Sequence, residues 1–257
     1  MSETGSAGVV SENGQQLAEE EDDLAQSLAG LSALPSAQMP LEQVLTRVAR
    51  YAVQAIPGAD GAGLTLLEQE RADLVVTTAD FVREVDDVQY SLGQGPCITA
   101  AREAVTVMSG SLGADLRWRR FGGRVARMGV HSVVSLPLIA ADEVVGAVNV
   151  YAHAKDAFDA RAAQLGELYA APAAIAVQNA HALEQTRRLA ARLQAALDTR
   201  MVIERAVGIM MSRSGVDEVE ALQRLRTLSQ HGHDKLVVVA QNIVDEAVRR
   251  AQSRHAP

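Results

Sequence analysis

The feature that most constrains the fold is a pair of long β-rich runs, Val130–Ile139 and Val144–Tyr151. Only Ala140–Glu143 joins them, and so short a connection suits an antiparallel pair but not parallel strands, which need a long crossover. Shorter β-rich runs precede the pair at Ala62–Leu67, Leu74–Thr78 and Ala104–Met108. Because helical patterns bracket this set, we predict an α+β domain whose antiparallel sheet is flanked by helices.

The flanking residues show helical periodicity. Apolar residues recur at helical spacing from Leu41 to Ala52, and Pro57-Gly58 stops the run. A later helix is expected to begin near Phe158 and to kink at Pro172. Residues 1–38 mix Gly, Ser, Gln and acidic side chains with little periodicity beyond three leucines. We therefore expect this acidic segment to be mostly disordered, with one or two helical turns at most.

The C-terminal part of the chain predicts a small all-α module. Gly215 ends one helix, and Asp217 with Glu220 forms a cap and capping box for the next. His231-Gly232-His233 breaks that second helix, and Asp234 is placed to cap a third. A length of 257 residues, 48% of them apolar, accommodates two modest domains.

A stripe of apolar residues precedes this module. Leu189, Leu193, Leu197 and Met201 recur at steps of four along a predicted linking helix, residues 183–204. Charged residues lie between them, so we interpret these four residues as a packing seam, either within the chain or between two copies. A homodimer through this helix is our hypothesis.

The charge is unevenly distributed. The chain carries a net charge of −8, yet residues 181–257 hold 12 Lys/Arg against 9 Asp/Glu. This contrast suggests a polyanion partner for the tail, with an ordinary solvated helical surface as the alternative. A single cysteine and the lack of a secretory or membrane-spanning pattern favour a cytoplasmic protein without a membrane partner.

The motifs of common enzymes are missing from the sequence. It contains no phosphate-binding loop, nucleophile elbow or His-Glu-x-x-His helix, so we predict no enzyme, no catalytic residues and no cofactor. His231 and His233 form either a helix-breaking loop or half of a metal site, and we favour the loop, hence no metal. The glycines of Gly93-Gln94-Gly95 are expected to form a turn with Pro96 rather than to open a helix.

Two places suggest a small-molecule pocket. Asp115, Arg117 and Trp118 put charges beside an aromatic ring between strands, as in a surface lid or in the wall of a ligand pocket. Cys97 follows a Gly-Pro turn and is either a small buried hydrophobe or a redox-responsive thiol.

The first part of the chain resembles a GAF sensor domain of the actinobacterial type, over residues 40–180. The resemblance rests on Pro57–Asp60, Ala62–Leu67, Leu92–Cys97, Arg117-Trp118, Gly129–Val133 and Gly146–Tyr151, which occur in order. It implies a GAF-type sheet and a pocket for a small-molecule signal, with Trp118, Arg117, Asp115 and Cys97 as its candidate residues.

The tail resembles an ANTAR domain, a helical RNA-binding antiterminator module, over residues 187–250. The matching residues are Arg200, Ile203, Ala206–Met211, Ala221, Leu225-Arg226, Leu228–Gln230, Lys235-Leu236 and Val239-Ala240. The resemblance implies a dimer that binds paired stem-loops in nascent messenger RNA and so keeps transcription going. Val207, His233 and Asp234 depart from the residues frequent in this family.

Candidate RNA-binding residues follow from this resemblance and from the charges. They are Arg205, Gly208, Arg213, Arg226, Gln230, His233 and Lys235. Glycine within a helix is unfavourable, so Gly208 indicates close approach of another helix or of an RNA backbone. Two other functions compete: a dimeric protein-interaction module without RNA, and an enzyme of the GAF fold such as a free methionine sulfoxide reductase, a class that uses several cysteines.

Overall fold

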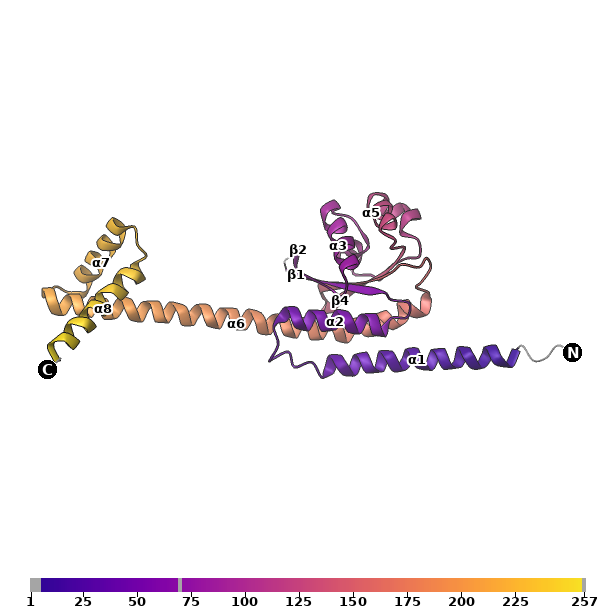
Figure 1. Ribbon diagram of the computed structural model, residues 1–257, viewed down its shortest axis with the longest axis horizontal. Helices are drawn as coiled ribbons and strands as arrows, with labels where there is room; N and C mark the ends of the chain where they lie inside the picture. Colours follow the sequence, from indigo (N-terminus) through magenta and orange to yellow (C-terminus); the bar gives the residue numbers. More distant parts are fainter. Residues whose placement is uncertain (1–5, 69–70, 256–257) are drawn as a thin grey trace. The chain divides into compact units, whose positions relative to one another are not determined.

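The computed structural model describes residues 6–68 and 71–255 (Figure 1). The chain forms two compact units, Met1–Glu184 and Gln185–Pro257, called here the N-terminal and C-terminal units. Among the described residues, no helix is both long and apolar enough to cross a membrane.

One antiparallel sheet organises the N-terminal unit. Its strands are β1 (Gly61–Glu68), β2 (Arg71–Thr77), β3 (Val107–Ser109), β4 (Ser132–Ala140) and β5 (Glu143–Ala152). They lie in the order β2-β1-β5-β4-β3, and each neighbouring pair is antiparallel. Between β4 and β5 the chain turns through Ala141 and Asp142, whose φ angles of 50° and 65° suit a two-residue hairpin. The predicted α+β class and the hairpin are confirmed.

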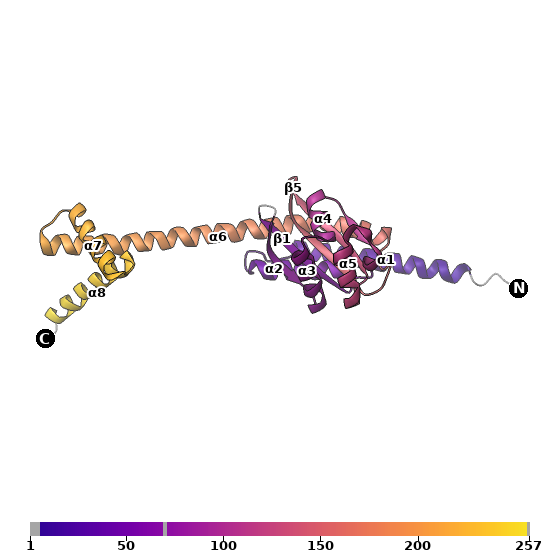
Figure 2. The same cartoon turned by 90° about the horizontal axis from the view of Figure 1, so that it is seen from above.

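Helices cover both faces of this sheet. They are α1 (Ser6–Ser32), α2 (Leu41–Ala55), α3 (Asp80–Leu92), α4 (Pro96–Glu103), α5 (Arg119–Val125) and α6 (Ala160–Ser214). Within the N-terminal unit, α2 and the first part of α6 pack on one face, and α3, α4 and α5 lie over the other (Figures 1 and 2). The three central strands, β1, β5 and β4, are therefore largely buried on both sides, whereas the edge strands keep exposed residues such as Val75 and Met108.

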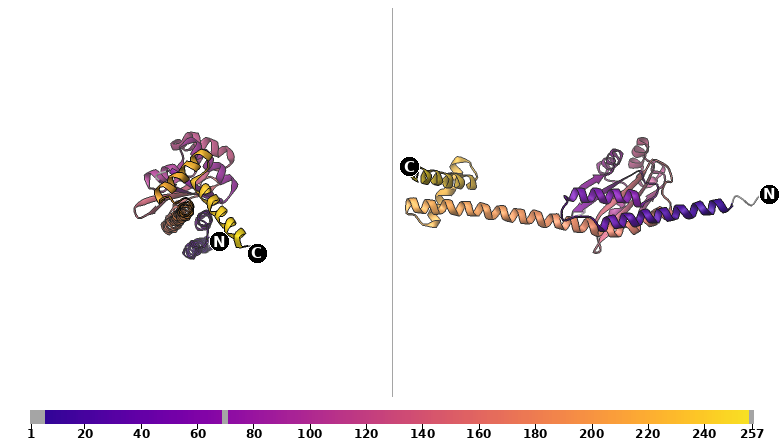
Figure 3. Two further views of the ribbon diagram at one scale, coloured as in Figure 1. Left: turned by 90° about the vertical axis from the view of Figure 1, so that its left-hand side faces the viewer. Right: turned by 60° about the horizontal axis from the view of Figure 1, so that its bottom comes forward.

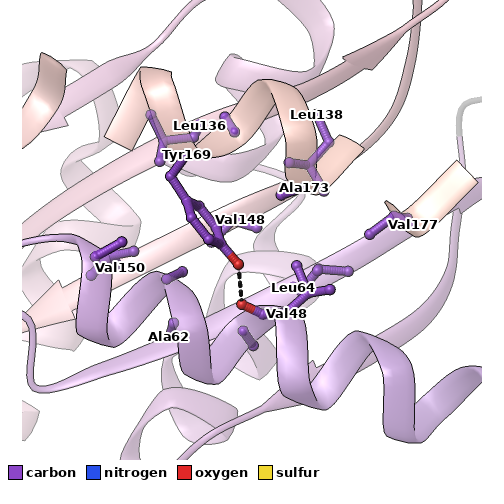
Figure 4. Close-up of a cluster of buried hydrophobic side chains, with 14 of the residues drawn as sticks. Val48, Ala62, Leu64, Leu136, Leu138, Val148, Val150, Tyr169, Ala173 and Val177 are labelled. Atoms are coloured by element: carbon purple, nitrogen blue, oxygen red, sulfur yellow. Dashed lines mark hydrogen bonds between the residues drawn. The ribbon is translucent and has the colours of Figure 1, made fainter. Parts of the chain in front are cut away.

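The face toward α2 and α6 is aliphatic. Alternate residues of β1, β4 and β5 point to it, namely Ala62, Leu64, Leu66, Val134, Leu136, Leu138, Val148 and Val150, and all are fully buried. Figure 4 shows Tyr169 of α6 among them, with its hydroxyl donating to the Val48 carbonyl of α2 at 2.6 Å. We call this the aliphatic face.

The N-terminal segment differs from its prediction. Where we expected a mostly disordered stretch, α1 is a 27-residue helix that lies beside α2 (Figure 3). Leu24 and Leu31 are buried against the core, and Arg161 of α6 pairs with Glu21 at 2.8 Å. Three leucines at helical spacing suffice because a neighbouring helix supplies the apolar surface that the isolated segment lacks.

The Gly93–Pro96 turn also differs from its prediction. Gly93 ends α3 with a φ of 62°, but Gly95 then serves as the N-cap of α4, and Pro96 is that helix's first residue. The expectation that these glycines open no helix is wrong, because a proline at the first helical position has no amide that needs a partner. The sequence patterns also predict no helix over residues 80–92, where the structure has α3.

The C-terminal unit is a small helical module. The later part of α6 meets α7 (Glu218–Gly232) and α8 (Leu236–His255) around five buried residues, which are Ala206, Val207, Ala221, Leu225 and Ala240. Asp217 caps α7 by accepting a hydrogen bond from the Glu220 amide at 2.8 Å, as predicted. Val207, which departs from the family pattern, belongs to this core.

Candidate functional site

The sheet face toward α3, α4 and α5 is polar where the opposite face is aliphatic. The same strands that carry leucine and valine on one side place Gly63, Thr65, Ser135, Asn149 and Tyr151 on the other. Asn149 is the register partner of both Gly63 on β1 and Ser135 on β4. Although polar, Thr65, Ser135 and Asn149 are 1%, 0% and 0% exposed. We call this the polar face.

Asp86 of α3 packs against the centre of the polar face. Its carboxylate is buried, and Oδ1 accepts a hydrogen bond from the Tyr151 hydroxyl at 2.8 Å. A Cβ on Gly63 would collide with Oδ2, so only glycine lets the carboxylate lie so close to β1. Burial raises the pKa of Asp86 to about 7; the Asp87 charge adds to this, while the hydrogen bond from the Tyr151 hydroxyl opposes it.

Helices α3 and α4 and strand β1 contribute the neighbouring polar groups. The Cys97 amide donates to Gln89 Oε1 at 3.0 Å, and Tyr90 joins the Thr65 hydroxyl to the Cys97 sulfur at 2.5 Å and 3.5 Å. Burial above all raises the pKa of the Cys97 thiol to about 11, so the thiol stays protonated near neutral pH. Cys97 is thus a buried member of a polar network and lacks the exposed, electropositive setting of a reactive thiol.

These groups form what we call the polar cluster: Thr65, Asp86, Gln89, Tyr90, Cys97, Ser135, Asn149 and Tyr151. Several of its buried atoms have no hydrogen-bond partner among the described residues, namely Asp86 Oδ2, Gln89 Nε2, Ser135 Oγ, and Asn149 Oδ1 and Nδ2. Leaving a buried polar group unpaired costs about 1–3 kcal/mol, so folded proteins rarely keep several together. The polar cluster is therefore the candidate ligand site of this unit.

The predicted pocket residues divide into two pairs. Cys97 lies in the polar cluster, and Trp118 is buried nearby in the core with its Nε1 donating to the Thr99 hydroxyl at 3.0 Å. Arg117 and Asp115 instead pair with each other at 2.7 Å. The Arg117 guanidinium also stacks over the Trp118 ring at 4.3 Å. Its hydrogen bond to Asp115 lowers the pKa of that carboxyl to about 2, so both groups are charged and already satisfied.

Sequence reasoning missed most of the polar cluster. Asp86 and Gln89 lie four and seven residues after Val82, on the buried side of α3. That helical spacing is a usable signal, because a polar residue in register with an apolar stripe is buried with it. Ser135 and Asn149 give the matching signal in the strands, where they alternate with buried aliphatic residues.

In the C-terminal unit, three predicted RNA-binding residues lie together. Arg205, Gly208 and Arg213 line a surface groove of about 410 Å³, with Ile209, Ser212 and Val244 completing its walls. Apart from Gly208 itself, its two neighbours in the chain and the nearby backbone of the same helix, no described heavy atom lies within 4 Å of where a Gly208 Cβ would be. Close approach of another helix of this chain therefore does not explain Gly208, and its open backbone faces the groove.

The remaining predicted RNA-binding residues lie along α7 and its turn into α8. Arg226, Gln230 and His233 recur at helical spacing and are exposed, and Lys235 immediately precedes α8. None of them lines the groove at Gly208. Arg224 pairs with Glu220 at 2.6 Å in a different groove. Among the described residues, no three metal-binding side chains cluster, so His231 and His233 belong to no such set.

Two family models match this chain. The GAF domain family matches residues 38–178, and the ANTAR domain family matches residues 191–244. No curated protein is similar enough to the chain to count as a match.

Several solved structures resemble about two thirds of the chain. The GAF domain of an Acinetobacter phosphoenolpyruvate-protein phosphotransferase is 14% identical, covers 65% of this chain and 97% of its own, and has a TM-score of 0.47. The reduced fRMsr of Staphylococcus aureus is 16% identical, with 62% and 94% covered and a TM-score of 0.47. A free methionine-R-sulfoxide reductase from Neisseria meningitidis, with its substrate, is 16% identical, with 67% and 93% covered and a TM-score of 0.43.

Proposed function

This chain belongs to the GAF domain family and carries an ANTAR domain after its GAF domain, and from this we propose that it is a transcription antitermination regulator. In this proposal the GAF domain binds a small signal molecule at the polar cluster. The ANTAR domain binds paired stem-loops of nascent messenger RNA, and the protein acts as a homodimer in the cytoplasm.

The groove at Gly208 is the observation that carries the RNA proposal. Arg205 and Arg213 flank a stretch of helix whose backbone is open to solvent at Gly208. Arginine recognises phosphate through charge-assisted hydrogen bonds, and a missing side chain lets a nucleic acid backbone come close to the helix. The glycine is unfavourable for the helix by about 1 kcal/mol, and approach of an RNA strand would offset that cost.

Replacing Gly208 with alanine separates stability from binding. Because the added methyl group meets open space, Gly208→Ala should stabilise the folded chain by about 1 kcal/mol in urea unfolding. It should also weaken binding to a paired-hairpin RNA by about tenfold in gel-shift titrations, since the methyl group occupies the RNA's position. Gly14→Ala is the matched control, because Gly14 is another open helical glycine, in α1. Unchanged RNA affinity in Gly208→Ala would exclude this groove as the RNA site.

The exposed residues at the α7–α8 turn make a second test of the RNA surface. If Lys235 contacts a phosphate, Lys235→Ala should weaken binding to all hairpins alike and reduce the salt slope by about one charge. Replacing His233 should instead change the preference among loop sequences, because a polar edge reads base identity. A salt series with several hairpins measures both effects, and an unchanged slope in Lys235→Ala would remove Lys235 from the RNA surface.

The homodimer proposal rests on the seam residues. Leu189, Leu193 and Leu197 are 57%, 58% and 55% exposed, which is unusual for a row of leucines along one helix. Replacing Leu193 and Leu197 with glutamate should yield monomers in light scattering. If the unaltered chain is already a monomer at micromolar concentration, the seam does not form a homodimer and the proposal is wrong.

Two competing functions make different predictions. A chain with GAF and ANTAR domains has the architecture typical of non-enzymatic regulators, and the buried, protonated Cys97 thiol is unsuited to the disulfide chemistry of a sulfoxide reductase. A dimeric interaction module without RNA would show no salt-dependent binding to paired hairpins, and a tight, strongly salt-dependent complex would exclude it.

A further inference from the structure

The unpaired atoms of the polar cluster limit the chemistry of its ligand. Two of them, Asp86 Oδ2 and Asn149 Oδ1, are acceptors without a donor, and Ser135 Oγ can accept as well. The ligand must therefore present N–H or O–H groups to this part of the cluster.

The charge of Asp86 limits which ligands the polar cluster can bind. The side chains that act on this carboxyl are Tyr151, Asp87 and Asn149, and Tyr90 and Cys97 lie in the same cluster. None of these groups is cationic, so an ionised Asp86 is a buried charge without a counter-ion. An anionic ligand would add a second negative charge at the same place, and a neutral ligand would leave the first one uncompensated.

We propose that the polar cluster binds a small organic cation, an amine or amidine, whose charged N–H groups pair with Asp86 Oδ2 and Asn149 Oδ1. This inference rests on the proposed sensing function and specifies its ligand class. The cation supplies the missing donors and the missing counter-charge together, and the ligand's remaining polar atoms are acceptors for Gln89 Nε2 and Asn149 Nδ2.

Three probe molecules of nearly equal size and shape test whether the polar cluster prefers a cationic ligand. Acetamidinium is cationic, acetamide is neutral and acetate is anionic. In thermal unfolding of the full chain at pH 8, acetamidinium should raise the melting temperature in a saturable manner, because a ligand that binds only the folded state stabilises it. Acetamide should have a smaller effect, and acetate none beyond that of chloride. Equal or stronger stabilisation by acetamide or acetate would overturn the proposal, and so would no effect of acetamidinium.

The pH dependence tests the role of Asp86 without any substitution. Acetamidinium stays cationic from pH 6 to pH 8, whereas the Asp86 carboxyl, with a pKa of about 7, must lose its proton to pair with it. The affinity should therefore rise about tenfold between pH 6 and pH 8, and binding at pH 6 should release close to one proton in calorimetry. A flat pH profile without proton release would overturn the proposal.

Asp86→Asn removes the charge and keeps the shape of the side chain. It should abolish both acetamidinium binding and its pH dependence. Asp87→Asn, which removes the same charge at an exposed neighbouring position, should leave binding at pH 8 intact and shift the pH profile slightly toward lower pH, because the Asp87 charge adds to the raised pKa of Asp86. Binding that survives in Asp86→Asn would overturn the proposal. Hairpin binding by the same preparations, measured without probe, separates the outcomes: loss of cation binding alone contradicts the ligand class, and failure of the unaltered chain to bind RNA contradicts the proposed function.

Discussion

The two faces of one sheet make the sharpest contrast in this molecule. Leu136 and Ser135 are neighbours on β4, both fully buried, yet Leu136 packs into the aliphatic face and Ser135 leaves an unpaired hydroxyl on the polar face. The aliphatic face meets the ordinary demands of a core, which are close packing and no unpaired polar atoms. The polar face violates the second demand repeatedly. Such local violations are expected where a protein binds something.

The largest expected effect compares Leu136 with Ser135. Leu136→Ala should destabilise the chain by about 3 to 4 kcal/mol, because it removes buried methyl groups and leaves a cavity. Ser135→Ala should be neutral or stabilise by up to about 1 kcal/mol, because it removes a buried hydroxyl that has no partner. Urea unfolding at 25 °C measures both. If Ser135→Ala destabilises the chain as a paired hydroxyl would, the two faces do not differ as we describe.

A smaller effect depends on pH. The carboxyl of Asp86 has a pKa of about 7 in the folded chain against an ordinary value of 3.8, so the folded state holds this proton more tightly. Its contribution to stability is full below the ordinary value and is lost as pH rises through about 7. Relative to Asp86→Asn, the unaltered chain should lose on the order of 3 kcal/mol between pH 4.5 and pH 8. Asp87→Asn keeps the Asp86 carboxyl, so it should lose nearly as much stability as the unaltered chain over this range. An equal loss in Asp86→Asn would show that another group causes the effect.

The smallest expected effect concerns two buried tyrosines. Tyr169→Phe removes a hydrogen bond to a neutral carbonyl on the aliphatic side and should cost about 1 kcal/mol at any pH. Tyr151→Phe removes the bond to Asp86 and should cost more above pH 7, where that carboxylate is ionised, by about 1 kcal/mol further. Equal, pH-independent costs would mean that Asp86 does not titrate in the folded chain.

The sequence predicts the aliphatic face better than the polar face. Hydrophobic alternation predicts β4 and β5, and the 3.6-residue period predicts α2, because in both cases burial and apolar character coincide. On the polar face they do not coincide. Asp86 and Gln89 are polar residues of a stretch with several charges, and their residue types alone do not mark them as buried. Their spacing from Val82 places them on the apolar side of α3, and the contact of Asp86 with Gly63 shows what that side packs against.

The helix boundaries of the C-terminal unit can be predicted from the sequence, but the grouping of its surface residues cannot. Gly215 and Asp217 mark the helix boundaries directly, since one needs a positive φ and the other accepts an amide hydrogen bond. Which arginines share a surface depends on how α6 packs against α8, and charge counting does not reveal it. The structure brings Arg205 and Arg213 to one groove and ties Arg224 to Glu220 in another.

The bare backbone at Gly63 has a consequence for genetics. Any side chain there would collide with the Asp86 carboxylate and press on Val82, so the carboxylate could not keep its present place against β1. If the polar cluster is the signal site, as we propose, a screen for alleles that no longer respond to the signal should return substitutions at codon 63. Such alleles would alter the N-terminal unit and leave the residues of the groove at Gly208 unchanged.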